Sequence, residues 1–295
     1  MKTYFITADT HSYYEELIKE LNKKGFDINN SNHIFVLCGD LFDRGPDSIK
    51  IYEFVKSIPK ERRILIRGNH EYLFIDLLAK DLPEKYDHSN GTVKTLNDLT
   101  LNKYANWIDL VLDKKLHEIK KWILSSDWID YLETKNYIFT HAFIPLNIDP
   151  ASPFQHMYMV ETKYLSYKDN WRESSPKEFE NATWGCPWKL AKEGLNKTGK
   201  VIVCGHWHTS DFFNNLKNLK IKYDIYKSNP IFISKKYKLI GLDACTAATH
   251  KVNVLVLNED ELYLIFCMLF MKGGNFKWLN LKIINTVIIK KYVIS

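Results

Sequence analysis

The sequence predicts an α/β fold built around a buried, largely parallel β-sheet. Over the first 80 residues, short apolar runs alternate with helix-like segments. This repeated order of strand, loop and helix is typical of a parallel sheet covered by helices. Several apolar runs end in loops rich in aspartate, asparagine and histidine. The carboxyl ends of strands are where open α/β sheets place their sites.

The amino-terminal part contains three pairs of strand and helix. The first helix places Leu17 and Leu21 on one face, as packing on a sheet requires. Pro46 directly precedes the second helix, and proline suits a first turn. The expected strands are Thr3–Ala8, His33–Cys38 and Arg63–Ile66, and the expected helices are Tyr13–Lys24, Asp47–Ser57 and His70–Lys80.

The remaining chain predicts a helical insert, two buried strands and an antiparallel end. Residues 81–135 are charged and aromatic, with apolar positions that suit helices over the sheet. Residues 150–199 are loop-rich, and a polar turn is expected at 258–261. The expected strands are Tyr137–Thr140, Val201–Cys204, Pro230–Ser234, Tyr237–Leu242, Val252–Leu257 and Leu262–Phe266.

Composition limits the classes of function. No repeat or low-complexity linker divides the 295 residues, so we expect one domain over 1–271, with 81–135 as its insert. The tail 272–295 is of unclear order and carries five lysines and no acid. The net charge of the whole chain is +6, so the other residues together contribute only +1. A stable nucleic-acid partner is therefore not indicated.

No apolar run approaches the roughly 20 residues of a membrane span. No secretory signal is visible, and five scattered cysteines without a CxxC pair favour reduced thiols in a cytoplasmic protein.

Two amino-terminal motifs carry candidate metal ligands. Asp9 and His11 follow the first strand, and residues two apart on an extended segment share one face. In GDLFDRG at 39–45, Gly39 permits a tight turn and Asp40 is the natural bridging carboxylate. Two ions about 3.5–4 Å apart can activate one water between them and hold phosphate oxygens.

The motif RGNHE at 67–71 adds groups for phosphate chemistry. Asn69 offers an amide oxygen to a second cation, and His70 is placed to protonate a leaving group. Asp43 could hydrogen-bond His70 and keep it charged. Arg44 and Arg67 are expected to clamp phosphate oxygens. Glu71 is expected only to favour the dipole of the following helix.

Three further histidines complete the candidate ligands. His141 follows the strand NYIFT, and His206 and His208 lie two apart in GHWH at 205–208, so both could face one site. The other five histidines lie outside the pattern and are expected in structural or surface positions. Trp171, Trp184 and Trp188 could stack on a base, but a core position is favoured for each.

In this order, the five motifs resemble the calcineurin-like metallophosphoesterase superfamily, whose pattern is DxH, GDxxDRG, GNHE, a lone His and GHxH. The Asp-Arg-Gly ending most resembles the phosphoprotein phosphatase branch, which includes serine/threonine phosphatases, bacteriophage-type phosphatases and dinucleoside tetraphosphatases. Asn90-Gly91-Thr92, with Thr95, and IGLDAC at 240–245 resemble elements of the bacterial members. The sequence departs from the pattern of this branch at two points. Trp207 follows the first histidine of the GHxH motif, and no arginine lies near Trp184.

The resemblance implies a four-layer α/β sandwich of two mixed β-sheets flanked by helices. It implies two divalent metal ions, drawn from Mn²⁺, Fe²⁺/Fe³⁺ and Zn²⁺. One ion would be bound by Asp9, His11, Asp40 and His208, and the other by Asp40, Asn69, His141 and His206.

The expected activity is that of a dimetal phosphomonoesterase of the serine/threonine protein phosphatase type, with a metal-bridging water attacking in line. The alternatives are a dinucleoside polyphosphate hydrolase and a phosphodiesterase or nuclease of the same superfamily. A non-enzymatic scaffold is disfavoured because none of the seven ligands is missing. The expected partner is a phosphorylated substrate, either a phosphoprotein or a nucleotide, with no membrane partner.

Overall fold

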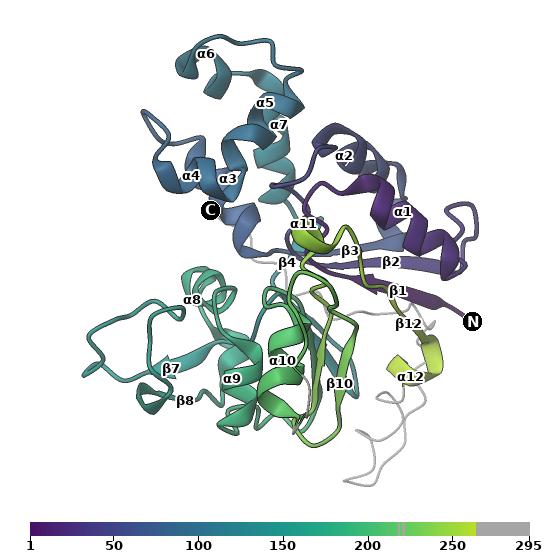
Figure 1. Ribbon diagram of the computed structural model, residues 1–295, viewed down its shortest axis with the longest axis vertical. Coiled ribbons are helices and arrows are strands. Elements are labelled where there is room, and N and C mark those ends of the chain that lie inside the picture. Colours follow the sequence, from purple (N-terminus) through teal and green to yellow (C-terminus); the bar gives the residue numbers. More distant parts are fainter. Residues whose placement is uncertain (218, 220–221, 264–295) are drawn as a thin grey trace, which may run out of the picture.

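Two five-stranded β-sheets stack face to face, and helices cover the outer face of each (Figure 1). The computed structural model describes residues 1–217, 219 and 222–263. The four layers confirm the α/β fold class expected from the sequence. The tail 272–295 lies outside the described residues, so its order stays a prediction, as does the division into one domain.

The first sheet is built mainly from the amino-terminal part of the chain. In spatial order it consists of β12 (Leu255–Asn258), β1 (Thr3–Thr7), β2 (His33–Cys38), β3 (Arg63–Ile66) and β4 (Trp128–Ile129). β1 to β4 are parallel, and β12 is antiparallel to β1. Side chains alternate along β1, so Ile6 packs between the sheets and Phe5 packs under the helices.

The second sheet is also mixed. In spatial order it consists of β10 (Phe232–Ser234), β11 (Leu239–Gly241), β9 (Val201–Cys204), β6 (Tyr137–Phe139) and β5 (Leu132–Glu133). Its three central strands are parallel and its two edge strands are antiparallel to their neighbours. A separate two-stranded ribbon joins β7 (Leu146–Ile148) to β8 (Leu165–Tyr167).

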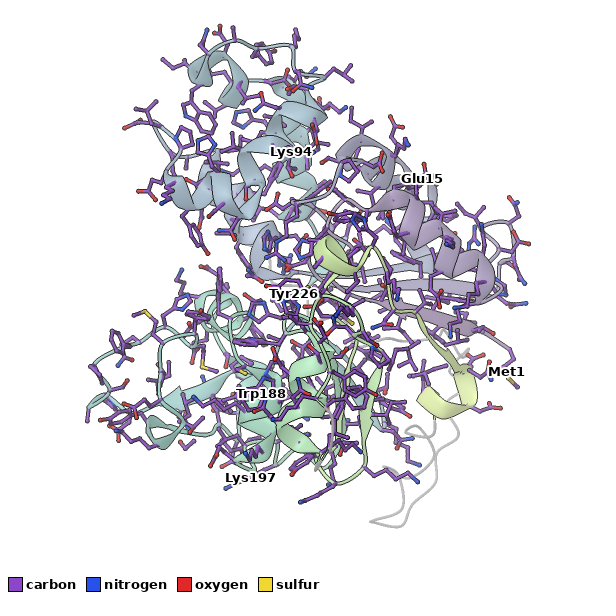
Figure 2. The ribbon with its side chains drawn as sticks, in the orientation of Figure 1. Met1, Glu15, Lys94, Trp188, Lys197 and Tyr226 are labelled. Atoms are coloured by element: carbon purple, nitrogen blue, oxygen red, sulfur yellow. The ribbon has the colours of Figure 1, made fainter. Side chains whose placement is uncertain are left out.

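The helices follow the sheets in chain order. On the first sheet, α1 buries Leu17 and Leu21 as predicted. Trp171 is fully buried in the second half, whereas Trp184 and Trp188 are partly buried against the same core (Figure 2 labels Trp188). The helices are α1 (Tyr14–Lys23), α2 (Ser48–Ser57), α3 (Asn69–Leu77), α8 (Pro176–Ala182), α9 (Pro187–Lys192), α10 (Thr209–Leu216), α11 (Thr246–Thr249) and α12 (Glu259–Tyr263).

The predicted insert is helical over most of its length. It contains α4 (Lys85–Asn90), α5 (Thr92–Leu99), α6 (Trp107–Val111) and α7 (Lys114–Ile123). The insert ends differently from the prediction, because β4 and β5 also lie within it. β4 pairs with β3 in the first sheet, and β5 pairs with β6 in the second. The end of the insert therefore links the two sheets.

The carboxyl-terminal prediction of consecutive antiparallel strands is wrong in two respects. Only β10 and β11 pair with each other, whereas β12 crosses to the first sheet. The residues expected to form a polar turn and a last strand instead begin α12, because Glu259 starts a helix directly after β12. Residues 264–266 lie outside the described part of the chain.

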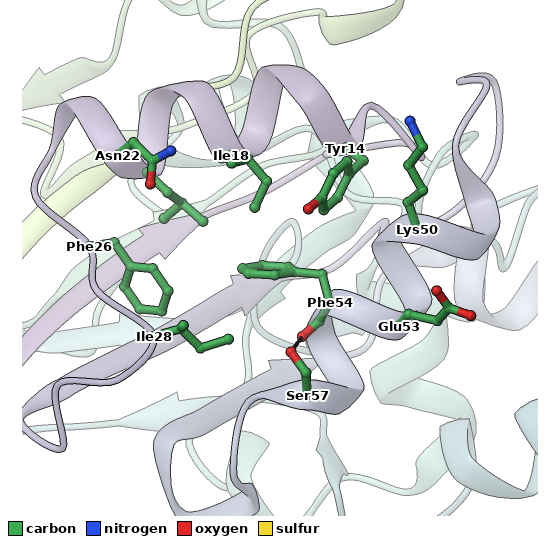
Figure 3. A pocket seen from close by; sticks show the side chains of 10 residues that line it. Tyr14, Ile18, Asn22, Phe26, Ile28, Lys50, Glu53, Phe54 and Ser57 are labelled. Atoms are coloured by element: carbon green, nitrogen blue, oxygen red, sulfur yellow. Dashed lines mark hydrogen bonds between the residues drawn. The ribbon is translucent and has the colours of Figure 1, made fainter.

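Outside the candidate site, a groove of about 530 Å³ separates α1 from α2. Figure 3 shows the apolar side chains of Ile18, Phe26 and Phe54 along its walls. None of the predicted site residues lines it.

Within the described residues, no helix is long and apolar enough to cross a membrane.

Candidate functional site

Asp40 lies at the centre of the candidate site, in the loop after β2. Its Oδ2 is 3.7 Å from His11 Nε2 and 3.9 Å from His70 Nε2. Its Oδ1 is 3.4 Å from His141 Nε2. His11, Asp40 and His70 form one group of ligand atoms within 4.8 Å of one another, and Asp40, His141 and His206 form a second. One carboxylate is therefore shared by two potential cation sites.

Asn69 and Asp9 extend the two groups. The amide oxygen of Asn69 is 2.8 Å from His141 Nε2, while His141 Nδ1 contacts the Cys38 carbonyl at 2.9 Å. Asp9 accepts the backbone N–H of His206 on both carboxylate oxygens at 3.0 Å. The loops after β1, β2, β3, β6 and β9 thus meet at the same place, although their motifs are far apart in sequence.

Glycines make this convergence possible. A Cβ at Gly205 would overlap the Asp9 carboxylate, and a Cβ at Gly68 would overlap that of Asp40. At Gly39 it would overlap the His141 ring, and the φ of +83° there is also unsuited to larger residues. The motif glycines are therefore required by close approach of neighbouring loops.

Six of the predicted site residues adopt left-handed backbone conformations: Asp9, His11, Asp40, Asp43, Arg44 and His206. Such conformations cost about 1 kcal/mol or more each and gather at functional sites. The reasoning that paired residues share one face of an extended segment is therefore wrong for Asp9 and His11. Both lie in the loop beyond the end of β1.

His70 and Asp43 form a buried pair. His70 Nδ1 is 2.6 Å from Asp43 Oδ2. The same oxygen accepts a hydrogen bond from the Thr92 hydroxyl at 2.7 Å, and Thr95 Oγ1 accepts the Asp43 backbone N–H at 3.1 Å. Two threonines at the start of α5 therefore hold Asp43 against the His70 ring.

Arg44 is exposed at the edge of the cluster. Its two terminal nitrogens lie 2.9 Å from His11 Nε2 and 3.1 Å from His70 Nε2. The guanidinium thus contacts two members of the first ligand group while remaining accessible from solvent. This position suits an incoming phosphate.

Arg67 takes a different position from the one predicted. Its guanidinium pairs with Asp130, at 3.0 Å and 2.9 Å, and donates to the carbonyls of Ile123 and Trp128. Because the guanidinium already contacts these groups, it braces the end of the insert. The expectation that Arg67 clamps phosphate is corrected accordingly.

Glu71 does more than favour the helix dipole. Its fully buried carboxylate accepts backbone N–H groups from Asp40, Leu41 and Gly68 at 2.7–2.9 Å. Burial, followed by the nearby charge of Asp40, raises the pKa of Glu71 to about 7. This side chain joins the loop after β2 to the loop after β3.

His208, which neither of the two ligand groups includes, contacts a buried aspartate that motif reasoning did not single out. Its Nδ1 is 2.9 Å from Asp243 Oδ2, and Cys245 Sγ is 3.6 Å from its Nε2. Asp243 is buried, and a carboxylate on the far ring nitrogen commonly orients a metal-binding histidine. The signal was present in IGLDAC, where an aspartate follows an apolar strand.

The site has the charge and donor set of a cation site. Burial and then the carboxylates of Asp243 and Asp40 raise the pKa of Asp9 well above its usual value. Burial is the first cause that lowers the pKa of His11, His141 and His206, so these rings stay neutral and able to bind a metal. Divalent ions among these oxygen and nitrogen donors would relieve the repulsion.

His70 differs from the three neutral histidines. Burial lowers its pKa, but Asp40 and Asp43 outweigh that effect, so its pKa is raised. A raised pKa favours a ring that carries a proton over one that binds a metal. Although His70 lies within ligand distance of Asp40, its environment suits proton transfer.

Comparison with known proteins identifies the class. The family model described as calcineurin-like phosphoesterase matches residues 2–210. The chain belongs to this family.

Particular relatives match part of the chain. The symmetrical bis(5'-nucleosyl)-tetraphosphatase of Proteus mirabilis is 33% identical over 126 residues, covering 42% of this chain and 44% of the relative. The enzyme of the same name from Buchnera aphidicola (subsp. Acyrthosiphon pisum, strain 5A) is 32% identical over 145 residues, covering 49% and 45%. The chain thus spans about half the length of the curated relatives it matches. A cold-active protein-tyrosine phosphatase from a Shewanella species shares the fold, with a TM-score of 0.50 and 15% sequence identity. The match covers 88% of this chain and 76% of the phosphatase chain.

Proposed function

We propose that this chain hydrolyses bis(5'-nucleosyl) tetraphosphates at a dimetal centre. The observation that carries the proposal is the pair of ligand groups sharing Asp40, with Arg44 beside His11 and His70 of one group. The names of the matched relatives favour a dinucleotide over the phosphoprotein first expected from the sequence. Symmetrical hydrolysis would add one water across the central P–O–P bond and release two nucleoside diphosphates.

Two groups of side chains would hold the ions. Asp9, His11, Asp40 and His208 would bind one, and Asp40, Asn69, His141 and His206 the other. Two closely spaced divalent ions supply an activated water and positive charge for the phosphate oxygens. The mixture of carboxylate, amide and imidazole donors suits manganese, iron or zinc.

We place the enzyme in the cytoplasm, since the four cysteines in the described part are free.

The chain's own groups would supply charge and a proton. Arg44 would neutralise phosphate oxygens as negative charge develops. His70 would protonate the leaving oxygen, with Asp43 holding the ring in place. With Arg67 directed to Asp130, only Arg44 of the predicted arginine pair remains for the substrate. Two guanidiniums would favour a dianionic terminal phosphate over a monoanionic diester, so a single Arg44 disfavours a diester less than the predicted pair would.

A substrate panel with Mn²⁺ tests the proposal. It compares diadenosine tetraphosphate, a phosphoserine peptide, p-nitrophenyl phosphate and bis-p-nitrophenyl phosphate. We expect the highest kcat/KM on diadenosine tetraphosphate, with ADP as the sole nucleotide product. A clear preference for the phosphoserine peptide would instead indicate a protein phosphatase. A strong preference for bis-p-nitrophenyl phosphate would indicate a phosphodiesterase.

A further inference from the structure

Two exposed tyrosines lie near the candidate site on separate parts of the fold. Tyr86 belongs to α4 of the insert and is 45% exposed. Tyr158 belongs to the loop between β7 and β8 and is 63% exposed. Figure 1 shows α4 on the half with the first sheet, and β7 and β8 on the other half. Two large aromatic side chains therefore stay accessible, one on each half of the molecule.

Tyr86 is linked to the site through the end of α4. Gly91 ends this helix with a φ of +87°, and a Cβ there would overlap the backbone nitrogen of Arg44. The next residue, Thr92, donates to Asp43. Burial is the main cause that raises the pKa of Tyr86, and the charges of Arg44 and Tyr158 also affect it. Tyr86 therefore belongs to the helix whose end packs against the backbone of Arg44.

Tyr158 is linked to the site from the opposite half. The backbone N–H of its neighbour Met157 donates to the Asn181 side chain at 2.8 Å. The His156 ring packs on Trp184 with centroids 5.4 Å apart, and Trp184 packs on His206 at 6.0 Å. The loop that carries Tyr158 is thus connected through two aromatic contacts to a predicted metal ligand.

Exposed aromatic rings beside a phosphate site suit a nucleotide. Stacking of a base on an aromatic side chain contributes considerable affinity and tolerates any base, because every base has a π-face. Tyrosine also presents a large contact area with little conformational entropy to lose. A phosphorylated serine side chain has no flat face that these rings would recognise.

We propose that Tyr86 and Tyr158 form the nucleobase contact of the substrate, one ring from each half of the molecule. This inference rests on the proposed dinucleotide substrate and adds to it the residues that recognise the base. The sequence suggested that Trp171 and two other tryptophans could stack on a base. The inference gives this stacking role to the two exposed tyrosines instead. Trp171 is fully buried and unavailable for it.

Kinetics of paired substrates test the assignment. The double variant Tyr86→Ala/Tyr158→Ala is assayed with Mn²⁺ on diadenosine tetraphosphate and on inorganic tripolyphosphate, which has the same anhydride bond but no base. We expect KM for the dinucleotide to rise about tenfold or more, the loss expected from base stacking. Hydrolysis of tripolyphosphate should stay unchanged. The double phenylalanine variant should behave like the wild type, as should Ile108→Ala, which removes an exposed apolar side chain of α6.

Binding of ADP separates this inference from the proposed function. Calorimetry compares ADP with inorganic diphosphate on the Mn²⁺-loaded wild type and the double alanine variant. If the wild type fails to hydrolyse diadenosine tetraphosphate but binds ADP more tightly than diphosphate, and only the variant loses that preference, the proposed function fails and the base contact stands. If the variant keeps the preference, or loses binding of both ligands equally, the base contact is overturned whatever the activity.

Discussion

At the scale of single residues, Asp40 is the side chain on which both ligand groups depend. It is buried, and its two oxygens face histidines from three separate loops. Removing one negative charge here leaves both groups without their shared donor. Neighbouring ligands cannot replace it, because their own positions are set by other hydrogen bonds.

We expect Asp40→Asn to lose bound manganese and catalytic activity together. The amide keeps the shape of the side chain but removes the charge that would bridge two ions. Metal analysis after gel filtration, in parallel with turnover, checks this. A variant that keeps a full complement of metal and full activity would refute the bridging role.

The second prediction concerns proton transfer from His70. His70→Asn should leave the metal content near normal and slow turnover of phosphoserine peptide roughly 10²–10⁴-fold. The loss should be smaller on p-nitrophenyl phosphate and on diadenosine tetraphosphate, whose leaving oxygens need less help from an acid. Rate ratios between the substrates check this, and equal losses on all three would count against the acid role.

Several residue roles were predictable and others were not. The Asp43 and His70 contact followed from motif spacing, because both loops end neighbouring parallel strands. The position of Arg67 did not, since its partner Asp130 follows a two-residue strand that no periodicity reveals. Asp243 was missed because one aspartate after a strand is too common a pattern to single out.

At the scale of elements, α5 supports the loop that carries Asp43 from outside. Thr92 and Thr95 both contact Asp43. Thr92→Val removes the hydroxyl without changing the side-chain shape, so Asp43 and His70 lose part of their orientation. We expect about a tenfold lower kcat, the typical effect of losing an orienting hydrogen bond.

The loss from Thr92→Val should be largest on the substrates with poor leaving groups, as for His70. Thr100→Val is the matched control, because Thr100 lies at the end of the same helix and bonds only helix carbonyls. Comparable losses in the two variants would show that α5 acts through stability alone.

Glu133 connects elements of the second half and should make stability depend on pH. It binds Arg172 at 2.6 Å and Lys200 at 2.7 Å. Burial raises its pKa, but these two cations outweigh that effect and lower it below the usual 4.5. The stabilisation is therefore present above about pH 4.5 and is lost as pH falls through the lowered pKa.

Glu133→Gln should reduce the free energy of unfolding by about 1 kcal/mol at pH 7, since the cluster is partly exposed. The difference from wild type should shrink towards zero near pH 3. Urea unfolding at both pH values measures it. Glu15→Gln, which alters an exposed pair with Lys50, should have little effect at either pH. A difference for Glu133→Gln that grew on acidification would contradict the account.

Most elements of the fold were predictable because each needs only local information. The alternation of β1, β2 and β3 with α1, α2 and α3 follows from apolar periodicity. The pairing of β12 with β1 does not, because it joins residues about 250 positions apart along the chain. The crossing of β12 to the first sheet therefore required the structure.

At the scale of the whole molecule, the candidate ligands come from both sheets. Asp40 and Asn69 follow strands of the first sheet, whereas His141 and His206 follow strands of the second. Ions bound between them would therefore stabilise the contact between the two layers as well as the candidate site.

Removal of metal should lower the melting temperature. A ligand at about 1,000 times its Kd adds about 4 kcal/mol to the stability of the native state. For a protein of this size, Mn²⁺ should raise Tm of the chelator-treated enzyme by roughly 10 °C. Thermal unfolding with and without Mn²⁺ measures this. Asp40→Asn should show almost no shift, and a full shift in that variant would place the stabilising ions elsewhere.

The most direct measurement is anomalous diffraction from crystals of the Mn²⁺-loaded protein. The account predicts two anomalous peaks about 3.5–4 Å apart, one on each side of the Asp40 carboxylate. One peak should lie towards His11 and Asp9, and the other towards Asn69, His141 and His206. A single peak, or peaks that leave Asp40 without a metal contact, would contradict the shared-carboxylate centre.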